Sequence, residues 1–203
     1  MSRLITNAIR STSASADAIT MDGSGNATFP ANVTCSGTAT GFGGGKLVNY
    51  GSVIKTDTFS QSLGQAVWSN DVITLSYTAA SSSNKLLLVA SLTVGYQHGQ
   101  SIKMRFTIGG SVITAATGDA AGSRGRATTE AWINGSSHAT NMTFNYLHSS
   151  PSTSAATYGV QIGQKDNGTQ TVYLNRSASD NNYDYDARLT SSLVIMELSL
   201  IHI

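Results

Sequence analysis

The sequence predicts an all-β protein, an antiparallel jelly-roll β-sandwich with a short, extended N-terminal segment. From Lys46 onward, short stretches alternate apolar and polar side chains, which is the two-residue period of a β-strand. Clusters of Gly, Asn, Asp and Ser separate these stretches at regular spacing, and there is almost no pattern typical of an amphipathic helix. About ten short strands in such a series are typical of a jelly roll.

The stretch Lys85–Tyr96 is the predicted centre of the fold. Its even-numbered residues from Leu86 to Tyr96 are apolar and would share one face of a strand. The other face begins apolar at Leu87 and turns polar at Ser91. We therefore expect a central strand that is buried on both faces at its beginning and half-exposed at its end.

Other stretches repeat the pattern. Ile102, Met104 and Phe106 form an apolar row, and the Gly109-Gly110 pair that follows suits a hairpin turn whose two residues need positive φ. Residues 127–133 and 142–148 are predicted to form another antiparallel pair. Further strands are predicted at Ile73–Tyr77, Ser111–Ala115, Tyr158–Ile162, Val172–Leu174 and Leu193–Ile203.

Residues 1–45 differ in composition from the rest, because Ser, Thr, Ala and Gly dominate them. Ala18–Met21 and Ala27–Phe29 are predicted as two short strands, joined by the turn Asp22–Asn26. A hairpin of this size buries too little surface to be stable alone, so it needs a partner. A glycine-rich linker ends this segment, so we divide the chain into an anchoring segment, 1–45, and a head domain, 46–203.

Composition narrows the range of partners. Charged residues make up 11% of the chain, against about 25% in typical soluble domains, and the net charge is +1. Such a neutral, hydroxyl-rich surface fits a protein that is held in an assembly or exposed outside a cell. It argues against nucleic acid and against membrane insertion, since the first needs a concentrated basic face and the second a long apolar span. The N-terminus shows no signal peptide, which predicts synthesis in a cytoplasm.

Several segments together resemble the C-terminal domains of bacteriophage tail fibres, and their layout is similar to the trimeric jelly-roll heads of the complement and tumour-necrosis-factor type. The segments are Lys85–Val89 after a Ser-rich loop, Ser149–Pro151 leading into Tyr158–Ile162, and Tyr173–Ser177 followed by Ser191–Glu197. The stretch Asp22–Pro30 resembles the short repeats of fibre shafts, although the chain has far fewer shaft residues than a long fibre.

This resemblance implies a virion structural protein that forms a homotrimer. Its N-terminal segment would contact other virion proteins, and its head would bind a glycan or protein on the host surface. No cofactor is implied. The alternative is a capsid decoration or tail-assembly protein without a receptor role.

The acidic loop Ser179–Asp186 is the most informative polar stretch. Alternating Tyr, Asp and Asn residues suit a loop that binds sugars or proteins, with rings that stack and carboxylates that accept hydroxyl groups. Tyrosines at these positions are also compatible with packing at a subunit boundary. The predicted receptor-binding residues are Tyr183, Asp184 and Tyr185 of this loop and Tyr96 and His98 of the turn after the central strand.

The same loop raises the question of calcium. Its oxygen-bearing side chains would share one face if extended, and such ligands suit that ion. The pattern of a helix-flanked calcium loop fails, because Tyr185 stands where Gly is required and Ser191 where Glu is required. A solvated turn explains the sequence more simply, so no metal site is predicted. The candidate ligands would be Asp180, Asn182, Asp184 and Asp186.

No catalytic motif stands out. The sequence lacks a nucleophile elbow, a phosphate-binding loop and a dinucleotide fingerprint, so we expect no enzymatic activity. A polysaccharide depolymerase would need a pair of carboxylates in a groove, for which Asp180, Asp184 and Asp186 are the candidates.

Two residues stand out from their predicted strands. Trp132 alternates out of the inward row, so it marks either a binding surface or the other half of a two-sided core. We favour a core or an interface, because large apolar residues mostly end buried. Glu197 lies within an apolar strand and, if buried, needs a partner such as Arg176, Arg188 or a symmetry copy.

Overall fold

The computed structural model describes residues 8–9, 13, 16–17, 19–24, 26–29, 46–97, 99–149, 151–165, 167–184 and 186–199. The chain divides into two compact units, Met1–Gly43 and Gly44–Ile203, close to the predicted boundary after residue 45. Among the described residues every regular element is a β-strand except one 3-10 helix, and all strand pairs are antiparallel. The predicted all-β, antiparallel class is therefore confirmed.

The first unit contains a small three-stranded sheet in the order β1-β2-β3. Its strands are β1 (Ala8–Ile9), β2 (Ile19–Met21) and β3 (Ala27–Thr28). The predicted turn between β2 and β3 is organised by Asp22, whose carboxylate accepts hydrogen bonds from the backbone N–H groups of Ser24 and Asn26 at 2.9 Å each. Such local bonding is why Asp favours turns.

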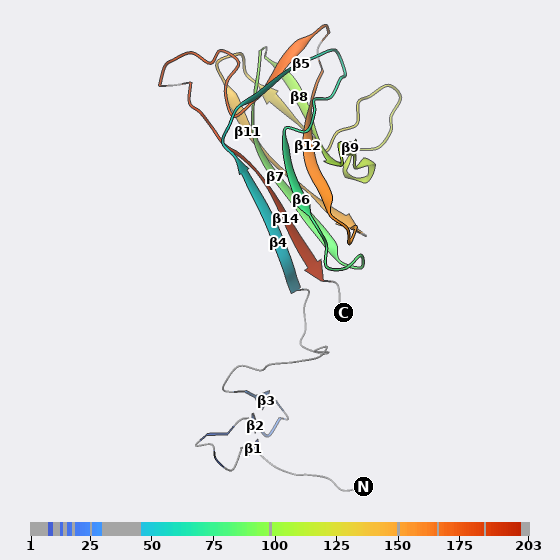
Figure 1. Ribbon diagram of the computed structural model, residues 1–203, viewed down its shortest axis with the longest axis vertical. Coiled ribbons are helices and arrows are strands. Elements are labelled where there is room, and N and C mark those ends of the chain that lie inside the picture. Colours follow the sequence, from blue (N-terminus) through green and yellow to red (C-terminus); the bar gives the residue numbers. More distant parts are fainter. Residues whose placement is uncertain are drawn as a thin grey trace. The chain divides into compact units, whose positions relative to one another are not determined.

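The second unit is a sandwich of two sheets (Figure 1). The large sheet contains β4 (Lys46–Lys55), β5 (Phe59–Leu63), β7 (Lys85–Tyr96), β11 (Ala139–Ser149), β13 (Gln170–Leu174) and β14 (Ser191–Ser199). The small sheet contains β6 (Ile73–Tyr77), β8 (Gln100–Ile108), β9 (Ser111–Val112), β10 (Thr129–Ile133) and β12 (Ala156–Gln164). The 3-10 helix η1 (Thr114–Ala116) follows β9.

The strand β7 is central, as predicted, but its burial runs opposite to the prediction, because Leu87 near its beginning is half-buried on the outer face whereas Thr93 and Gly95 near its end are buried. One of its edges pairs with β11 from Lys85 to Gly95. The other edge is shared, because β14 pairs with its first half and β13 with Val94–Tyr96 at its end. The even-numbered residues of β7, from Leu86 to Tyr96, are all 0% exposed. They lie on the inner face of the large sheet and form the centre of the core on that side.

The core lies between the sheets. The predicted apolar row Ile102, Met104 and Phe106 on β8 is fully buried, as are Val160 and Ile162 on β12. Both glycines of the predicted β8–β9 turn have positive φ, at 56° for Gly109 and 77° for Gly110. The small sheet thus covers the inner face of the large one with alternate side chains of each strand.

Strand partners differ from the sequence prediction at one place. Residues 127–133 and 142–148 do not pair with each other, because β10 pairs with β8 in the small sheet and β11 pairs with β7 in the large sheet. The connection 134–138 crosses between the sheets, and Gly135 turns it with a φ of 83°. Alternation predicts that a segment is a strand, but it does not say which strand lies beside it.

Glu197 of β14 is buried, and its partners are not the predicted arginines. Its carboxylate accepts hydrogen bonds from the Tyr77 hydroxyl at 3.1 Å, from Asn84 Nδ2 at 2.6 Å and from the backbone N–H groups of Ala80 and Ser81. Burial opposes the charged form, but these donors outweigh it and lower the pKa of Glu197. Burial, with the bond to this carboxylate, raises the pKa of Tyr77 to about 12. Neutral donors satisfy this carboxylate.

Candidate functional site

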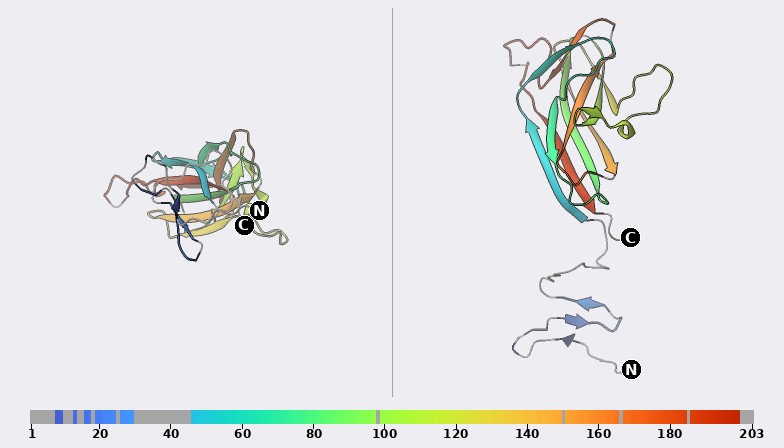
Figure 2. Two further views of the ribbon diagram at one scale, coloured as in Figure 1. Left: turned by 90° about the horizontal axis from the view of Figure 1, so that it is seen from below. Right: turned by 45° about the vertical axis from the view of Figure 1, so that its right-hand side comes forward.

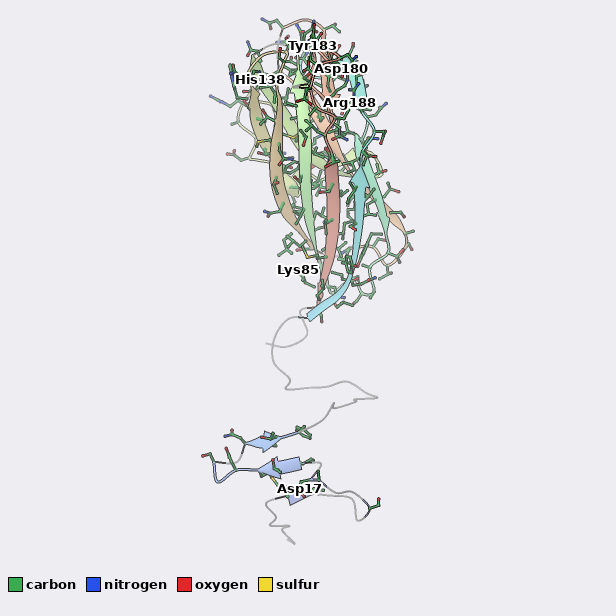
Figure 3. All side chains as sticks on the ribbon, turned by 90° about the vertical axis from the view of Figure 1, so that its left-hand side faces the viewer. Asp17, Lys85, His138, Asp180, Tyr183 and Arg188 are labelled. Atoms are coloured by element: carbon green, nitrogen blue, oxygen red, sulfur yellow. The ribbon has the colours of Figure 1, made fainter. Side chains whose placement is uncertain are left out.

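The distal loop, residues 175–190, is anchored firmly at its base. Asn175 has a positive φ of 61°, and its side-chain amide donates to the backbone carbonyls of Lys55 and Asp57 at 2.9 Å each. Ser191 Oγ donates to the same side chain at 2.6 Å. The loop projects from the end of the strands opposite Lys85, with Asp180, Tyr183 and Arg188 at that end (Figure 3).

Asp180 is the centre of this loop. Its carboxylate forms an ion pair with Arg176 Nη1 at 2.7 Å, and it accepts two hydrogen bonds from the Arg188 guanidinium. Asp186 belongs to a separate network, in which it accepts bonds from Ser177 Oγ at 2.7 Å and from the backbone N–H of Asn181 at 3.1 Å. The loop is therefore held in shape by its own acidic residues.

This arrangement does not support the calcium alternative. Two guanidinium groups already neutralise Asp180, and a cation would have to displace both of them. Within the described ranges, no group of three or more acidic or histidine side chains is placed to hold a metal ion. The candidate ligands Asn182 and Asp184 lie on the exposed side of the loop.

Beside the loop lies a cleft of about 220 Å³. It separates the distal loop from the connection between β10 and β11, and the two segments are joined by a hydrogen bond from Ser179 N to Ser136 O at 2.9 Å. The cleft is lined by Ser137, His138, Ala139, Ser177, Asp186, Ala187 and Leu189. Hydroxyl, imidazole and carboxylate groups of this kind can form hydrogen bonds with a polar ligand.

The structure separates the predicted receptor-binding residues. Tyr183 is 62% exposed and Asp184 is exposed, so both are accessible to a ligand. Tyr96 is 0% exposed, and its hydroxyl donates to Gln164 in the core at 3.4 Å, so its prediction as a receptor contact is wrong. The alternation that buries Leu86 continues to the last residue of β7. His98 and Tyr185 lie outside the described residues.

Sequence reasoning missed a second polar surface, on the outer face of the small sheet. Trp132 is 59% exposed there, so a place in the core of a single chain, one of the two expected positions, is wrong. Behind the projecting loop 117–128, which stands away from the strands in both Figure 1 and the right-hand view of Figure 2, lies a cleft of about 360 Å³. We call it the cationic cleft, and it is lined by Lys103, Arg124, Gly125, Glu130 and Lys165.

The outer face of the large sheet has the opposite character. The strand register places Tyr50, Met196, Leu87 and Leu147 in one row across β4, β14, β7 and β11. Tyr50 is 65% exposed and Leu147 43% exposed. We call this surface the outer apolar face, and its further members are Leu47, Ile54, Val89, Val194 and Leu198.

No family model and no curated protein matched the chain. In the part of the chain that the structure describes, no helix has the length and apolar character to cross a membrane.

Proposed function

We propose that this chain is a structural protein of a phage virion, a fibre or fibre tip that forms a homotrimer and attaches to the host surface with its head domain. The observation that carries the proposal is the outer apolar face of the large sheet. Monomeric soluble proteins rarely expose a large contiguous apolar patch, so such a face indicates an interface. Full burial of an exposed side chain such as Ile54 contributes about 1.5–3 kcal/mol.

A second copy of the chain is the partner that fits best. The face has almost no charge, so it offers nothing that selects a charged partner, and closed symmetry buries the same surface on every copy. The connectivity supports a jelly roll, because the order β4-β14-β7-β11 faces the order β6-β12-β8-β10 and the chain crosses repeatedly between the sheets. The resemblance to trimeric jelly-roll heads favours three copies.

The first unit supports an anchoring role. Its apolar side chains Ile9, Met21 and Phe29 are 37% to 46% exposed, so the small sheet does not bury them by itself. Contact with other virion proteins, or with the same segment of other copies, would cover them. Location in the virion is part of this proposal.

The attachment role rests on the distal loop. In the second unit this loop lies at the end opposite Lys46, where β4 begins, and it presents Tyr183 and Asp184 to solvent. Two of the three carboxylates that a depolymerase could use are engaged within the loop, since Asp180 is paired to two arginines and Asp186 is bonded to Ser177, which leaves only Asp184 for a catalytic pair that needs two. This favours binding without catalysis, and no cofactor is required.

The mass of the purified protein tests the trimer. Light scattering should give three times the chain mass of 21.1 kDa at micromolar concentration. A stable monomer under these conditions would contradict the proposal. Binding of the labelled protein to bacterial cells distinguishes attachment from the alternative role of a decoration or tail-assembly protein, because a decoration protein would form the assembly without binding cells.

A further inference from the structure

We propose that the cationic cleft on the outer face of the small sheet binds an acidic saccharide, a sugar that carries a carboxylate or a phosphate group. This names a ligand class for the attachment role and rests on that proposed function. The site is distinct from the distal loop, which belongs to the other sheet's connections.

The register of the small sheet brings the parts of the site together. Glu130 of β10 lies opposite Lys103 of β8, which lies opposite Gly163 of β12, and Trp68 pairs with Gly163 from the far side. Residues directly opposite each other in an antiparallel sheet point to the same face. This row therefore crosses the whole outer face, with an aromatic ring at one end and a carboxylate at the other.

Cationic side chains dominate the cleft. Lys103, Arg124 and Lys165 line it with Glu130 as the acidic group, and an adjoining hollow of about 310 Å³ adds Arg126 and Asp119. The chain has 12 lysines and arginines in total, so a substantial part of its positive charge gathers here. Such a concentration attracts an anion although the whole protein is nearly neutral.

The loop 117–128 holds this charge in place. Arg126 Nε donates to the backbone carbonyl of Gly118 at 2.7 Å, which ties the two ends of the loop together. A Cβ atom at Gly125 would lie 2.6 Å from Lys103 Nζ, so the absence of a side chain there lets the lysine lie against the loop backbone. Arg124 is exposed, and Lys165, although it forms an ion pair with Glu130 at 3.5 Å, has a side chain that is 54% exposed, so both cations are accessible.

Both tryptophans of the chain lie on this face. The Trp68 ring packs on Gly163, where a Cβ atom would be 2.9 Å away, and Arg105 stacks on it at 4.1 Å. Trp132 is two residues from Glu130 on the same strand, at roughly 7 Å along it, and its exposed ring offers a flat apolar surface. The C–H face of a sugar ring can pack against such a surface.

The carboxylate of Glu130 favours a saccharide over a nucleic acid as the ligand of the cleft. A hydrogen bond from Ser101, together with the nearby Lys165 and Lys103, lowers the pKa of Glu130, so the group is an acceptor at neutral pH. A carboxylate accepts hydrogen bonds from the free hydroxyl groups of a sugar, whereas a DNA strand offers no free hydroxyl groups between its phosphates. Nucleic acid also requires a broader basic surface than a chain of net charge +1 provides.

Tryptophan fluorescence of the full chain measures binding directly. The carboxylate probe is an oligogalacturonate, and its methyl ester is the neutral control with the same sugar. The phosphate probe is a phosphomannan fragment, with its dephosphorylated form as control, and a single-stranded oligothymidylate tests nucleic acid. We expect at least one acidic saccharide to change the emission at millimolar concentration or below and its neutral form to have no effect, with Trp132→Phe identifying the reporting ring.

Variants locate the site. The double substitution of Arg124→Ala with Lys165→Ala should weaken binding about tenfold or more, because two charge-assisted contacts are lost. Lys55→Ala removes a positive charge from β4 of the large sheet, outside both the cationic cleft and the distal loop, and should leave binding unchanged. Thermal unfolding and mass of each variant establish that the fold and the assembly are intact.

Three outcomes would overturn the inference: no acidic probe binds, the neutral or oligothymidylate probe binds equally well, or the double variant loses no more binding than Lys55→Ala does. None of these outcomes changes the measured mass. If the double variant still binds cells as a trimer, the attachment role stands and the cleft is not its site; if the wild-type chain is monomeric and does not bind cells, the proposed function itself fails.

Discussion

The outer faces of the two sheets are built by the same alternation of side chains, yet they carry different chemistry. Across the large sheet the register aligns Tyr50, Met196 and Leu87, which are apolar. Across the small sheet the equivalent row joins Glu130 and Lys103 to Gly163 under Trp68. The inner faces of both sheets are mostly apolar, with Glu197 on the large sheet and Gln164 on the small sheet as buried polar exceptions, so the outward residues are what distinguishes the sheets.

A sandwich of low charge can therefore use one outer face for assembly and the other for a ligand. An apolar outer face is costly in water and favours a permanent interface. A face with charges, hydroxyls and partly covered rings is stable in water and remains free for a reversible ligand. In the proposed trimer the outer face of the large sheet would serve assembly, and the outer face of the small sheet would remain free for a ligand in addition to the distal loop.

The largest effect is expected from a charge placed on the outer apolar face. Leu87→Asp should abolish the trimer at micromolar concentration, because a buried, unpaired carboxylate costs at least about 3 kcal/mol per subunit. Light scattering measures the loss. Ser76→Asp, which makes the same change at an exposed position on the small sheet, is the matched control and should keep the trimer. A trimeric Leu87→Asp variant would place the interface elsewhere.

One glycine on the outer face of each sheet lies under a covering group, and its substitution by alanine tests how rigid that cover is. A Cβ atom at Gly95 of β7 would lie 2.3 Å from the backbone carbonyl oxygen of Arg176, whereas a Cβ atom at Gly163 of β12 would meet only the Trp68 ring at 2.9 Å. Gly95→Ala should therefore lower the free energy of unfolding by about 3 kcal/mol, and Gly163→Ala by about 1 kcal/mol. Denaturant unfolding at neutral pH measures the free energy of unfolding of both variants. Equal losses would contradict the difference between a glycine covered by backbone and one covered by a side chain.

The two glutamates give a smaller and pH-dependent test. Glu197→Gln places an amide nitrogen among donors, and we expect a loss of about 2 kcal/mol in the free energy of unfolding. Because folding lowers the pKa of Glu197, its contribution is present above the unfolded value and is lost as the pH falls through the lower folded value. Wild-type stability should therefore fall on acidification more than that of the variant.

Glu130→Gln is the control for this experiment. Its carboxylate also has a lowered pKa, but it lies on the outer face of the small sheet and is 47% exposed. Solvent screens such a group, so its removal should change the free energy of unfolding little. Thermal unfolding of the Glu197→Gln and Glu130→Gln variants at pH 7 and at pH 3 compares their stabilities. A larger loss of stability for Glu130→Gln would contradict the stabilising role of the buried hydrogen bonds to Glu197.

The smallest effect is expected at Trp132. Because its ring is 59% exposed, Trp132→Ala should alter the free energy of unfolding by no more than about 0.5 kcal/mol. Denaturant unfolding followed by circular dichroism measures this without the lost fluorophore. A loss as large as that of a core residue would mean that the ring is covered in the assembled protein.

What the sequence could predict was the local part of this fold. Alternation identified β7 and the buried row on β8, and the Gly109-Gly110 pair identified its turn, because these features depend on neighbouring residues. Partners could not be predicted, since β10 and β11 are consecutive in the chain and still enter different sheets.

The same limit applies to the candidate sites. Glu197 finds its donors more than a hundred residues away, between Tyr77 and Asn84, which no local pattern reveals. The cationic cleft combines residues of β8, of β10, of the loop before β10 and of the turn that follows β12. Tyr96 could have been placed correctly, because its position in the inward row of β7 already indicated a buried side chain.

Strands β4 and β14 are antiparallel neighbours, and their register sets Ser199 opposite Lys46. The polypeptide therefore enters and leaves the sandwich at adjacent points of one end. A unit with this geometry can be spliced into a surface turn of an unrelated carrier, or circularly permuted by a short bridge from residue 199 to residue 46, with little strain on either side. The opposite end, with the distal loop, would then remain available for display or for sequence diversification.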